Sequence, residues 1–331
     1  MIELEQIQRS LKQCADSQPL MAYWDDALFT PLSDLFARPK KEFRAQMVHI
    51  GFDLAKGQSN QDTQHNLQLL AQIIEAIHSG SLIVDDIEDG SEVRRGAPTL
   101  HLIYGLPKAL NAGNWLYFFA FHLIGKLKID ANTKILLFEN ISEALLAAHY
   151  GQALDVGAPM DQVNPEHIPM ICQKSLELKS GVLMGLAMQL GALLAGADLA
   201  RTKQIYRFGV DFGVCLQRFD DIGNLNTDKP TAKHLEDLIL KRPSWVWSYL
   251  YSNRSSQEQE EFKLALQKLP QISALSDFLA KTGFRQACFQ EARAQLEILL
   301  ATLKQNFELA DHSDVYVQIQ RLGDKLTYAY K

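Results

Sequence analysis

Apolar residues recur every three or four positions along extended stretches of this chain. Asn66 to Val84 carries this spacing, and the same spacing returns in Ile135 to Leu154, Ser180 to Leu194, Ile205 to Phe219 and Gln286 to Leu303. A period between three and four residues predicts amphipathic α-helices. The chain lacks a sustained valine–threonine alternation and an Asn-Gly turn, which are the usual signals of strands and hairpins. The pattern therefore predicts an all-α protein.

Helix-breaking residues fall between these runs, at 94–98, 157–159 and 228–230, and no low-complexity linker divides the chain. The 331 residues, 47% of them hydrophobic, are enough to bury a large core. We therefore expect residues 1–331 to form a single domain, a large antiparallel helical bundle.

One segment, Gly181 to Ala197, is apolar enough to raise the question of a membrane span. It only just reaches the minimum length, and Gln189 lies in its middle. We interpret it as a buried helix and predict no transmembrane segment. The N-terminus lacks the basic and apolar regions of a secretory signal, so we expect a cytoplasmic protein.

Charge and cysteine content narrow the possible functions. The net charge is −6, with no basic excess that would indicate nucleic-acid binding. The four cysteines are far apart and form no CxxC pair, so we expect reduced thiols rather than disulfides or a zinc site. They are Cys14, Cys172, Cys215 and Cys288.

Two acidic clusters each close an apolar helical run. In the first, Asp85 and Asp89 are four residues apart and share a helix face, with Asp86 beside them. In the second, Asp220 and Asn224 share a face, with Asp221 beside them. Like charges placed together repel, and a hard divalent cation with oxygen ligands would offset that cost. Either cluster alone could instead be a solvated acidic helix end, but their joint occurrence favours a magnesium site.

Magnesium completes its coordination with phosphate or water oxygens, so the predicted substrate carries phosphate. Cationic side chains, which suit phosphate oxygens, lie near both clusters in the sequence. Any one of them alone could be a solvated surface charge; they are Lys41, Arg44, Arg94, Arg95, Lys179, Lys233 and Arg242.

The ordered motifs DDIED, RRGAPTLH, GQALD, ELKSG, LQRFDDIGN and EDLILKRPSW resemble those of the trans-type polyprenyl diphosphate synthases. The segment from Glu75 to Leu116 looks especially like the geranylgeranyl diphosphate synthases. The resemblance runs from about Lys41 to Trp245. It implies a helical bundle around a central cavity, the isoprenoid synthase fold, in a homodimer. It also implies head-to-tail condensation of isopentenyl diphosphate with an allylic diphosphate, which lengthens an all-trans prenyl diphosphate.

The resemblance also implies roles for individual residues. Asp85, Asp86, Asp89, Asp220, Asp221 and Asn224 would hold a cluster of three magnesium ions. Lys179, Lys233, Arg242 and Arg94 would contact the allylic diphosphate, and Lys41, Arg44, His78 and Arg95 would bind isopentenyl diphosphate. Ser180 and Gln217 would line the reacting end of the allyl group, as Asp155 would less directly. A bend in the main chain near Lys179 and the Gln217 amide would stabilise the carbocation, from which water must be kept away.

Several positions depart from the family pattern. Asn224 replaces the usual third aspartate, Arg242 replaces lysine, Lys241 replaces glycine, Ser180 replaces threonine, and Asn114 stands where aspartate is common. None of these changes removes the expected metal ligands or cationic sites.

Product length is expected to depend on the helix before Asp85. Gly80 and Ser81, five and four residues before that aspartate, are small and would let a prenyl tail grow past fifteen carbons. Ile77, one turn deeper, would contribute to the floor, so we predict a twenty-carbon product.

Two other functions fit parts of the pattern. A class I terpene cyclase or head-to-head synthase would share the first aspartate motif, but DDIGNLNTD lacks the glutamate of the usual second cyclase motif. A non-catalytic partner subunit would have lost one aspartate motif, and this chain retains both.

Overall fold

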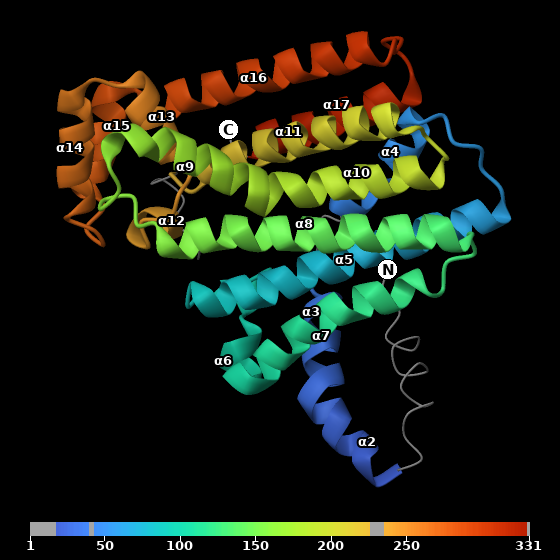
Figure 1. The fold of residues 1–331 in the computed structure, drawn as a ribbon. Helices are drawn as coiled ribbons and strands as arrows, with labels where there is room; N and C mark the ends of the chain where they lie inside the picture. The colour runs from blue at the N-terminus through green and yellow to red at the C-terminus, as the bar shows by residue number, and fades with distance from the viewer. Residues whose placement is uncertain (1–17, 40–42, 226–234, 330–331) are drawn as a thin grey trace. The chain divides into compact units, whose positions relative to one another are not determined.

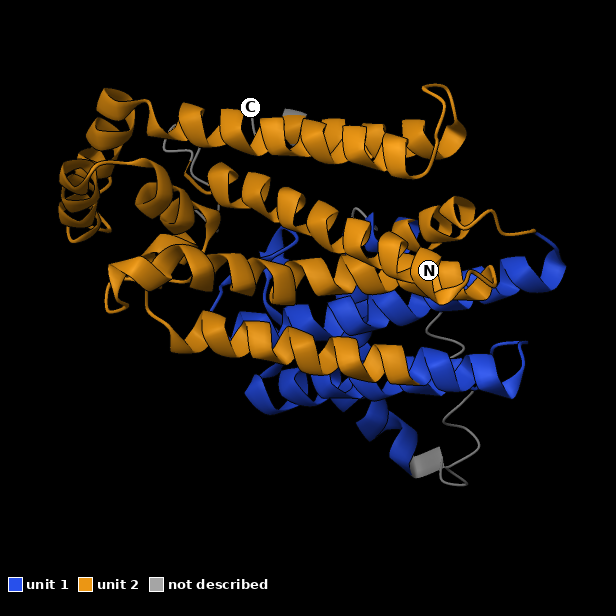
Figure 2. Cartoon of the chain, turned by 45° about the horizontal axis from the view of Figure 1, so that its top comes forward, with its two compact units in different colours: residues 1–46, 59–138 blue, residues 47–58, 139–331 orange. Residues whose placement is uncertain are grey.

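The computed structural model describes residues 18–39, 43–225 and 235–329, which are almost entirely helical (Figure 1). All five predicted helical runs are confirmed. The chain divides into two compact units (Figure 2). Unit 1 comprises residues 1–46 and 59–138, and unit 2 comprises residues 47–58 and 139–331. The expectation of a single domain stays a prediction.

Unit 1 is organised around the long helix α5 and its neighbour α7 (Figure 1). Gly80 of α5 and Gly113 of α7 allow the two backbones to approach closely, since a Cβ on Gly80 would lie 2.8 Å from the Gly113 carbonyl oxygen. The Asn60 side chain caps the start of α5 by accepting a hydrogen bond from the Thr63 N–H. The helices of unit 1 are α2 (Gln18–Trp24), η1 (Asp25–Phe29), α3 (Thr30–Ala37), α5 (Gln61–Glu88), α6 (Leu100–Tyr104) and α7 (Leu106–Ile124).

A small hairpin follows α5, which the sequence pattern did not predict. Strands β1 (Val93–Arg94) and β2 (Ala97–Pro98) pair antiparallel, with Arg94 opposite Ala97. The two turn residues, Arg95 and Gly96, have φ values of +56° and +78°. Positive φ at both central positions is typical of a type I′ turn, which here uses Arg95-Gly96 in place of Asn-Gly.

Helices α4 (Phe43–Leu54) and α8 (Ala131–Gly157) begin in unit 1 and end in unit 2. In unit 2, α10 packs along α11 (Figure 1). Most residues of α10 are buried, which confirms the interpretation of the apolar segment after Gly181 as a buried helix. The other elements of unit 2 are η2 (Pro165–His167), α9 (Ile168–Ser175), η3 (Leu176–Gly181), α10 (Val182–Leu194), α11 (Leu199–Gly223), α12 (Glu236–Ile239), α13 (Trp245–Asn253), α14 (Ser256–Leu266), α15 (Ser273–Thr282), α16 (Phe284–Asn306) and α17 (Asp314–Ala329).

An aromatic cluster joins the C-terminal helices of unit 2. The ring of Phe262 lies 5.6 Å from Trp247, 5.4 Å from Phe278 and 5.8 Å from Phe284, measured between centroids. Such packing stabilises the helices that follow the second acidic motif. Cys172, Cys215 and Cys288 are free thiols, as predicted, and all three are buried. Cys14 lies outside the described residues.

Among the described residues, one helix, α5, is long and apolar enough to cross a membrane. About three-fifths of its most apolar window (61%) is buried within the protein. A buried core helix shows these same properties, so α5 is weak evidence for a membrane span.

Candidate active site

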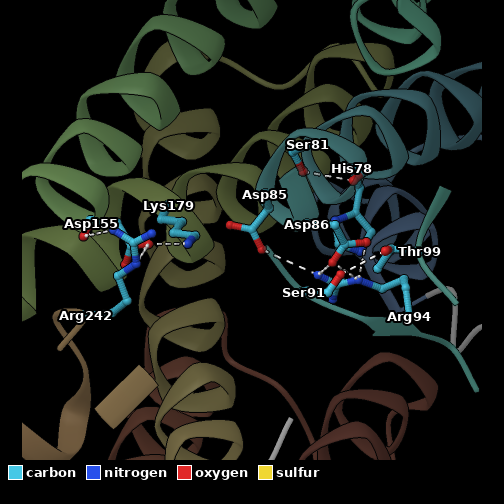
Figure 3. Close-up of polar contacts among 10 residues, drawn as sticks. All are labelled: His78, Ser81, Asp85, Asp86, Ser91, Arg94, Thr99, Asp155, Lys179 and Arg242. Carbon is cyan, nitrogen blue, oxygen red and sulfur yellow. Dashed lines mark hydrogen bonds and ion pairs between the residues drawn. The ribbon is translucent and has the colours of Figure 1, made fainter. Parts of the chain in front are cut away.

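The first acidic motif lies at the C-terminal end of α5, where Arg94 of β1 contacts it (Figure 3). Arg94 Nε donates to Asp86 Oδ1 over 2.8 Å and to Asp86 Oδ2 over 3.0 Å. Arg94 Nη2 also donates to Asp86 and lies 3.5 Å from Asp85 Oδ2. Asp86 is buried, whereas Asp85 and Asp89 are partly exposed. Arg94 thus contacts Asp85 and Asp86, while the joint action of the three carboxylates, Asp89 included, stays a prediction.

Backbone contacts fix the hairpin beside this helix end. The Ser91 N–H donates to the Asp86 carbonyl oxygen over 3.0 Å, and Thr99 Oγ1 donates to the Ser91 carbonyl oxygen over 2.8 Å (Figure 3). Both Ser91 and Thr99 are buried. The hairpin is therefore tied to the last turn of α5, which places Arg94 against the aspartates.

Arg44 and His78 form the second contact group of unit 1. Arg44 Nη1 lies 3.0 Å from His78 Nε2. Burial, together with the charges of Arg44, Arg95 and Arg94, holds the pKa of His78 well below its usual range. His78 is therefore neutral, and because a guanidinium can only donate, Nε2 accepts this hydrogen bond. Burial also lowers the pKa of Arg95.

The sequence patterns did not identify Arg38 and Asp34, which complete the charged region of unit 1. Arg38 is buried, and its Nε and Nη2 donate to the two carboxylate oxygens of Asp34 over 2.9 and 3.1 Å. Its Nη1 donates to the Arg94 carbonyl oxygen over 3.0 Å. The hydrogen bonds from Arg38 lower the pKa of Asp34. A lone Asp-x-x-x-Arg spacing gives no sequence signal, so only the fold shows that Arg38 supports the hairpin.

In unit 2, Asp155 of α8 joins two predicted diphosphate-binding cations (Figure 3). Lys179 Nζ donates to Asp155 Oδ2 over 2.7 Å. Arg242 Nη1 donates to the Asp155 carbonyl oxygen over 3.1 Å, and Arg242 Nε lies 4.0 Å from Asp155 Oδ2. The Asp155 side chain is 6% exposed, and the Lys179 side chain is 30% exposed. Lys179 thus keeps access to solvent while its position is held by a buried carboxylate.

The main chain near Lys179, where the resemblance implied a bend, forms a π-helical turn, η3. Such turns leave backbone carbonyls without their usual helical partners and are frequent at functional sites. Gly151 permits η3 to lie against α8, because a Cβ there would come within 2.6 Å of the Lys179 nitrogen. The sequence therefore places a glycine where the backbone of η3 needs the space.

Ser180, Gln217 and Asp221 form one chain of hydrogen bonds. Ser180 Oγ donates to Gln217 Oε1 over 2.8 Å, and Gln217 Nε2 donates to Asp221 Oδ1 over 2.9 Å. The backbone N–H of Trp245 donates to Asp221 Oδ2 over 2.7 Å. Both oxygens of Asp221 are thus held by the protein, while Asp220 is exposed. Burial and the charge of Asp237 raise the pKa of Asp221 well above its usual range.

Asp237 is a further acidic residue of this region that the sequence patterns did not single out. Asn224 Nδ2 donates to Asp237 Oδ2 over 3.2 Å, and Asp221, Asn224 and Asp237 line one small cavity. Burial and the charge of Asp155 raise the pKa of Asp237 to about 6. Asp237 lies within the motif EDLILKRPSW, so the sequence shows an acidic residue there but not that it lies beside Asn224.

The three residues proposed to set product length lie on α5. Ile77 and Gly80 are buried, and Ser81 is partly exposed, with its Oγ donating to the His78 carbonyl oxygen over 2.8 Å. Gly80 faces α7, which gives its small size a packing explanation. Its role in product length stays a prediction, as do the roles of Ile77 and Ser81.

Two predicted cations, Lys41 and Lys233, lie outside the described residues. Within the described residues, no group of three or more His, Cys, Asp or Glu side chains is arranged to hold a metal ion by itself. A shared magnesium site between the two acidic motifs stays a prediction, because the motifs lie in different units.

The model of the polyprenyl synthetase family matches residues 25–280, more than three-quarters of the chain. The chain belongs to this family. The match covers both acidic motifs, the β1–β2 hairpin and η3. The predicted resemblance to polyprenyl diphosphate synthases is therefore confirmed.

Two relatives of this chain, one archaeal and one fungal, are named geranylgeranyl diphosphate synthases. A geranylgeranyl diphosphate synthase of Sulfolobus acidocaldarius is 32% identical over 199 residues, which span 59% of this chain and 57% of that protein. A geranylgeranyl pyrophosphate synthase of Macrophomina phaseolina is 26% identical over 89% of this chain and 86% of that protein. The aligned region thus spans little more than half the length of the archaeal relative.

Solved structures confirm the all-α isoprenoid synthase fold of this family member. The geranylgeranyl pyrophosphate synthetase of Pyrococcus horikoshii superposes with a TM-score of 0.75 at 22% identity, covering 97% of this chain and 94% of that chain. A decaprenyl diphosphate synthase of Rhodobacter capsulatus superposes with a TM-score of 0.76 at 18% identity, covering 99% and 100%. Enzymes named for different product lengths fit equally well, so these superpositions show the fold alone.

Proposed function

We propose that this polyprenyl synthetase is a magnesium-dependent trans-prenyltransferase of the cytoplasm. It condenses isopentenyl diphosphate head to tail with an allylic diphosphate and yields a longer all-trans prenyl diphosphate, geranylgeranyl diphosphate. The family match and the relatives named geranylgeranyl diphosphate synthases support this assignment.

The observation that carries the proposal is the arrangement of partly exposed charges around buried carboxylates. In unit 1, Arg94 lies between Asp85 and Asp86. In unit 2, Lys179 and Arg242 meet at Asp155 (Figure 3). A magnesium diphosphate combines cationic and anionic groups, and it would find complementary partners in such mixed clusters.

The residues present fit magnesium. Asp85, Asp89 and Asp220 offer carboxylate oxygens with solvent access, which suits an ion that retains water and phosphate ligands. Both carboxylate oxygens of Asp86 and of Asp221 accept hydrogen bonds from protein donors. The Asn224 side chain donates to Asp237. These three residues would therefore position the metal ligands rather than coordinate magnesium as the main ligands. Bound magnesium would supply Lewis-acid stabilisation of the departing diphosphate.

The remaining chemistry falls to the side chains. Lys179, Arg242 and Arg94 would bind the allylic diphosphate, as would Lys233, and their positive charge stabilises the negative charge that develops as the allylic carbon–oxygen bond breaks. Arg44, His78 and Arg95, with Lys41, would hold isopentenyl diphosphate.

The new carbon–carbon bond forms when the double bond of isopentenyl diphosphate attacks the allylic cation. A proton then leaves to the released diphosphate, and the alkene is restored. The Gln217 amide oxygen and the carbonyls of η3 would stabilise the cation before attack. Ser180 orients that amide through its hydrogen bond to Oε1.

The proposal includes a homodimer formed through α7. Leu106, Leu110 and Phe118 recur at multiples of four along this helix and are 51%, 40% and 74% exposed. Large apolar side chains gathered on one helix face are typical of an interface. Light scattering of the purified protein measures the mass, and a monomeric mass would contradict this part.

Product analysis tests the proposed function directly. Purified protein is incubated with magnesium, isopentenyl diphosphate and, in separate reactions, dimethylallyl, geranyl or farnesyl diphosphate, and products are identified by mass spectrometry. Elongation that stops at twenty carbons, and that EDTA abolishes, is the expected result. Cyclised products formed without consumption of isopentenyl diphosphate would instead indicate a cyclase, and no turnover with any starter would indicate a non-catalytic subunit.

A further inference from the structure

Arg218 is a buried cation of α11 to which no role has been assigned above. The residue is 8% exposed, and its Nε lies buried without a hydrogen-bond partner among the described residues. Burying a charged group with an unpaired donor destabilises a fold relative to an apolar residue of similar size. The unpaired Nε therefore makes Arg218 a candidate for a role beyond fold stability.

Besides Cys215 on its own helix, Arg218 contacts two side chains on other elements. Its Nη2 donates to Gln173 Oε1 on α9 over 3.1 Å. Its guanidinium carbon lies 4.2 Å from the centroid of the Trp245 ring, at the start of α13. A planar guanidinium can stack on a ring and donate in its own plane at the same time, which a lysine ammonium cannot do.

Both contacts connect to the hydrogen-bond chain of the candidate site. Helix α9 continues directly into η3, which carries Ser180, and the backbone N–H of Trp245 holds Asp221 Oδ2. Ser180 and Asp221 bind the two ends of the Gln217 amide. The contacts thus close a ring that runs from Arg218 through Gln173, η3, Gln217, Asp221 and Trp245 back to Arg218, all within unit 2.

We propose that Arg218 is a positioning residue that fixes the orientation of the Gln217 amide by bracing η3 through Gln173 and the start of α13 through Trp245. The inference rests on the proposed function. Arg218 keeps the amide nitrogen on Asp221 and the amide oxygen beside Ser180, where an electron-deficient carbon is stabilised. Loss of the Arg218 contacts to Gln173 and Trp245 lets the Gln217 amide rotate. Small displacements of this kind slow a reaction more than they weaken substrate binding.

The test measures how the allylic cation is partitioned between isopentenyl diphosphate and water. Capture by water forms a carbon–oxygen bond, releases a proton and gives the allylic alcohol with free diphosphate. The ratio of alcohol to elongated product does not depend on how much of the enzyme is folded, so it separates positioning from stability. Arg218→Met removes both contacts, and Arg207→Met on the same helix is the matched control, since Arg207 is exposed and paired with Asp211.

We expect Arg218→Met to lower kcat about tenfold, to change the KM of either diphosphate by less than about twofold, and to raise the alcohol-to-product ratio about fivefold. Gln173→Leu should raise the ratio in the same direction, and it carries the test if Arg218→Met does not fold. The double variant should match Arg218→Met alone, because both residues act through one ring.

An unchanged alcohol-to-product ratio in Arg218→Met would overturn the positioning role. The same conclusion would follow if the effects of Arg218→Met and Gln173→Leu on this ratio multiplied in the double variant, or if Arg207→Met raised the ratio equally. Wild-type enzyme that consumes no isopentenyl diphosphate would instead overturn the proposed function itself.

Discussion

Lys179 Nζ donates to Asp155 Oδ2 over 2.7 Å, which joins a cation of the π-helical turn to a buried carboxylate of α8. Arg242 approaches the same carboxylate, so one aspartate balances two cations. Under the proposed function, a diphosphate bound here would meet side chains whose positions are already fixed. Preorganised charge of this kind needs little rearrangement when negative charge develops.

Removing that carboxylate should destabilise the protein. Asp155→Asn leaves Lys179 and Arg242 without their shared anionic partner, and we expect a loss of about 1–3 kcal/mol in the free energy of unfolding, measured by urea denaturation. The exposed pair Arg293–Glu297 provides the control, because Glu297→Gln should change stability by less than about 0.5 kcal/mol. Equal losses of unfolding free energy in Asp155→Asn and Glu297→Gln would show that burial of Asp155 does not strengthen its contribution to stability.

Asp85→Ala should strongly decrease turnover while the helical bundle stays folded. The residue is partly exposed at a helix end, so its removal leaves the core intact. We expect a decrease in kcat on the order of 10²–10³-fold, as when one group that stabilises developing charge is lost. Circular dichroism and Tm establish that the variant is folded, and activity near the wild-type level would contradict the metal assignment.

Protonation of His78 should make stability depend on pH. Its folded-state pKa lies well below the unfolded value of 6.5, so the unfolded chain binds the proton more readily. This contribution to stability is fully present above pH 6.5 and is lost as the pH falls below that value, by at most about 1.4 kcal/mol per pH unit. His78→Gln keeps an acceptor for Arg44 and removes this dependence.

Urea denaturation of wild type and His78→Gln between pH 5 and 7.5 measures the effect. Other titrating groups, including Asp237, are common to both proteins and cancel in the difference. If the free energies of unfolding of wild type and His78→Gln changed in parallel with pH, His78 would have an ordinary pKa in the folded protein.

The backbone at Lys241 should prefer glycine. Its φ of +59° lies in the left-handed region, and this is the position where the family commonly has glycine. Lys241→Gly and Lys241→Ala both remove the ion pair with Asp161, but only the alanine keeps a Cβ. We expect the glycine variant to be more stable than the alanine variant by about 1 kcal/mol. Equal Tm values for the two variants would contradict this account.

Product length should respond to Ser81 more cleanly than to Gly80. Ser81→Phe should shift products toward fifteen carbons if the tail passes this position. Gly80→Ala should destabilise the protein by about 1–3 kcal/mol, since the new Cβ would lie 2.8 Å from the Gly113 carbonyl oxygen. Gly157→Ala is the control, because a Cβ there meets nothing within 4 Å. An unchanged product spectrum in Ser81→Phe would remove Ser81 from the length-determining set.

Much of the fold was predictable from the sequence, because long helices leave a strong periodic signal. The spacing of apolar residues located α5, α8, α10, α11 and α16, and their breakers marked the loops. The β1–β2 hairpin was missed, since its turn uses Arg95 at positive φ instead of asparagine. That conformation depends on the contacts that tie the hairpin to α5, which no local pattern reveals.

The candidate site was predictable in its residue types but not in its pairings. The motifs identified Asp85, Asp86, Arg94 and Lys179, yet only the structure shows that Arg94 holds Asp86. Arg38 and Asp237 were missed because each contacts another element of the fold. Arg38 donates to the Arg94 carbonyl oxygen, and Asp237 accepts from Asn224. Side-chain partners depend on tertiary packing, which the spacing of residues along the chain does not specify.

The glycines around η3 limit which substitutions this protein can accept. A Cβ on Gly151 would lie 2.6 Å from the backbone nitrogen of Lys179. A Cβ on Gly213 would lie 3.1 Å from the carbonyl oxygen of Ser180. Helices α8 and α11 thus both pack against the main chain of η3, and a side chain at either glycine would displace it. Attempts to evolve acceptance of bulkier starters should therefore leave this turn untouched and seek space further along the prenyl tail.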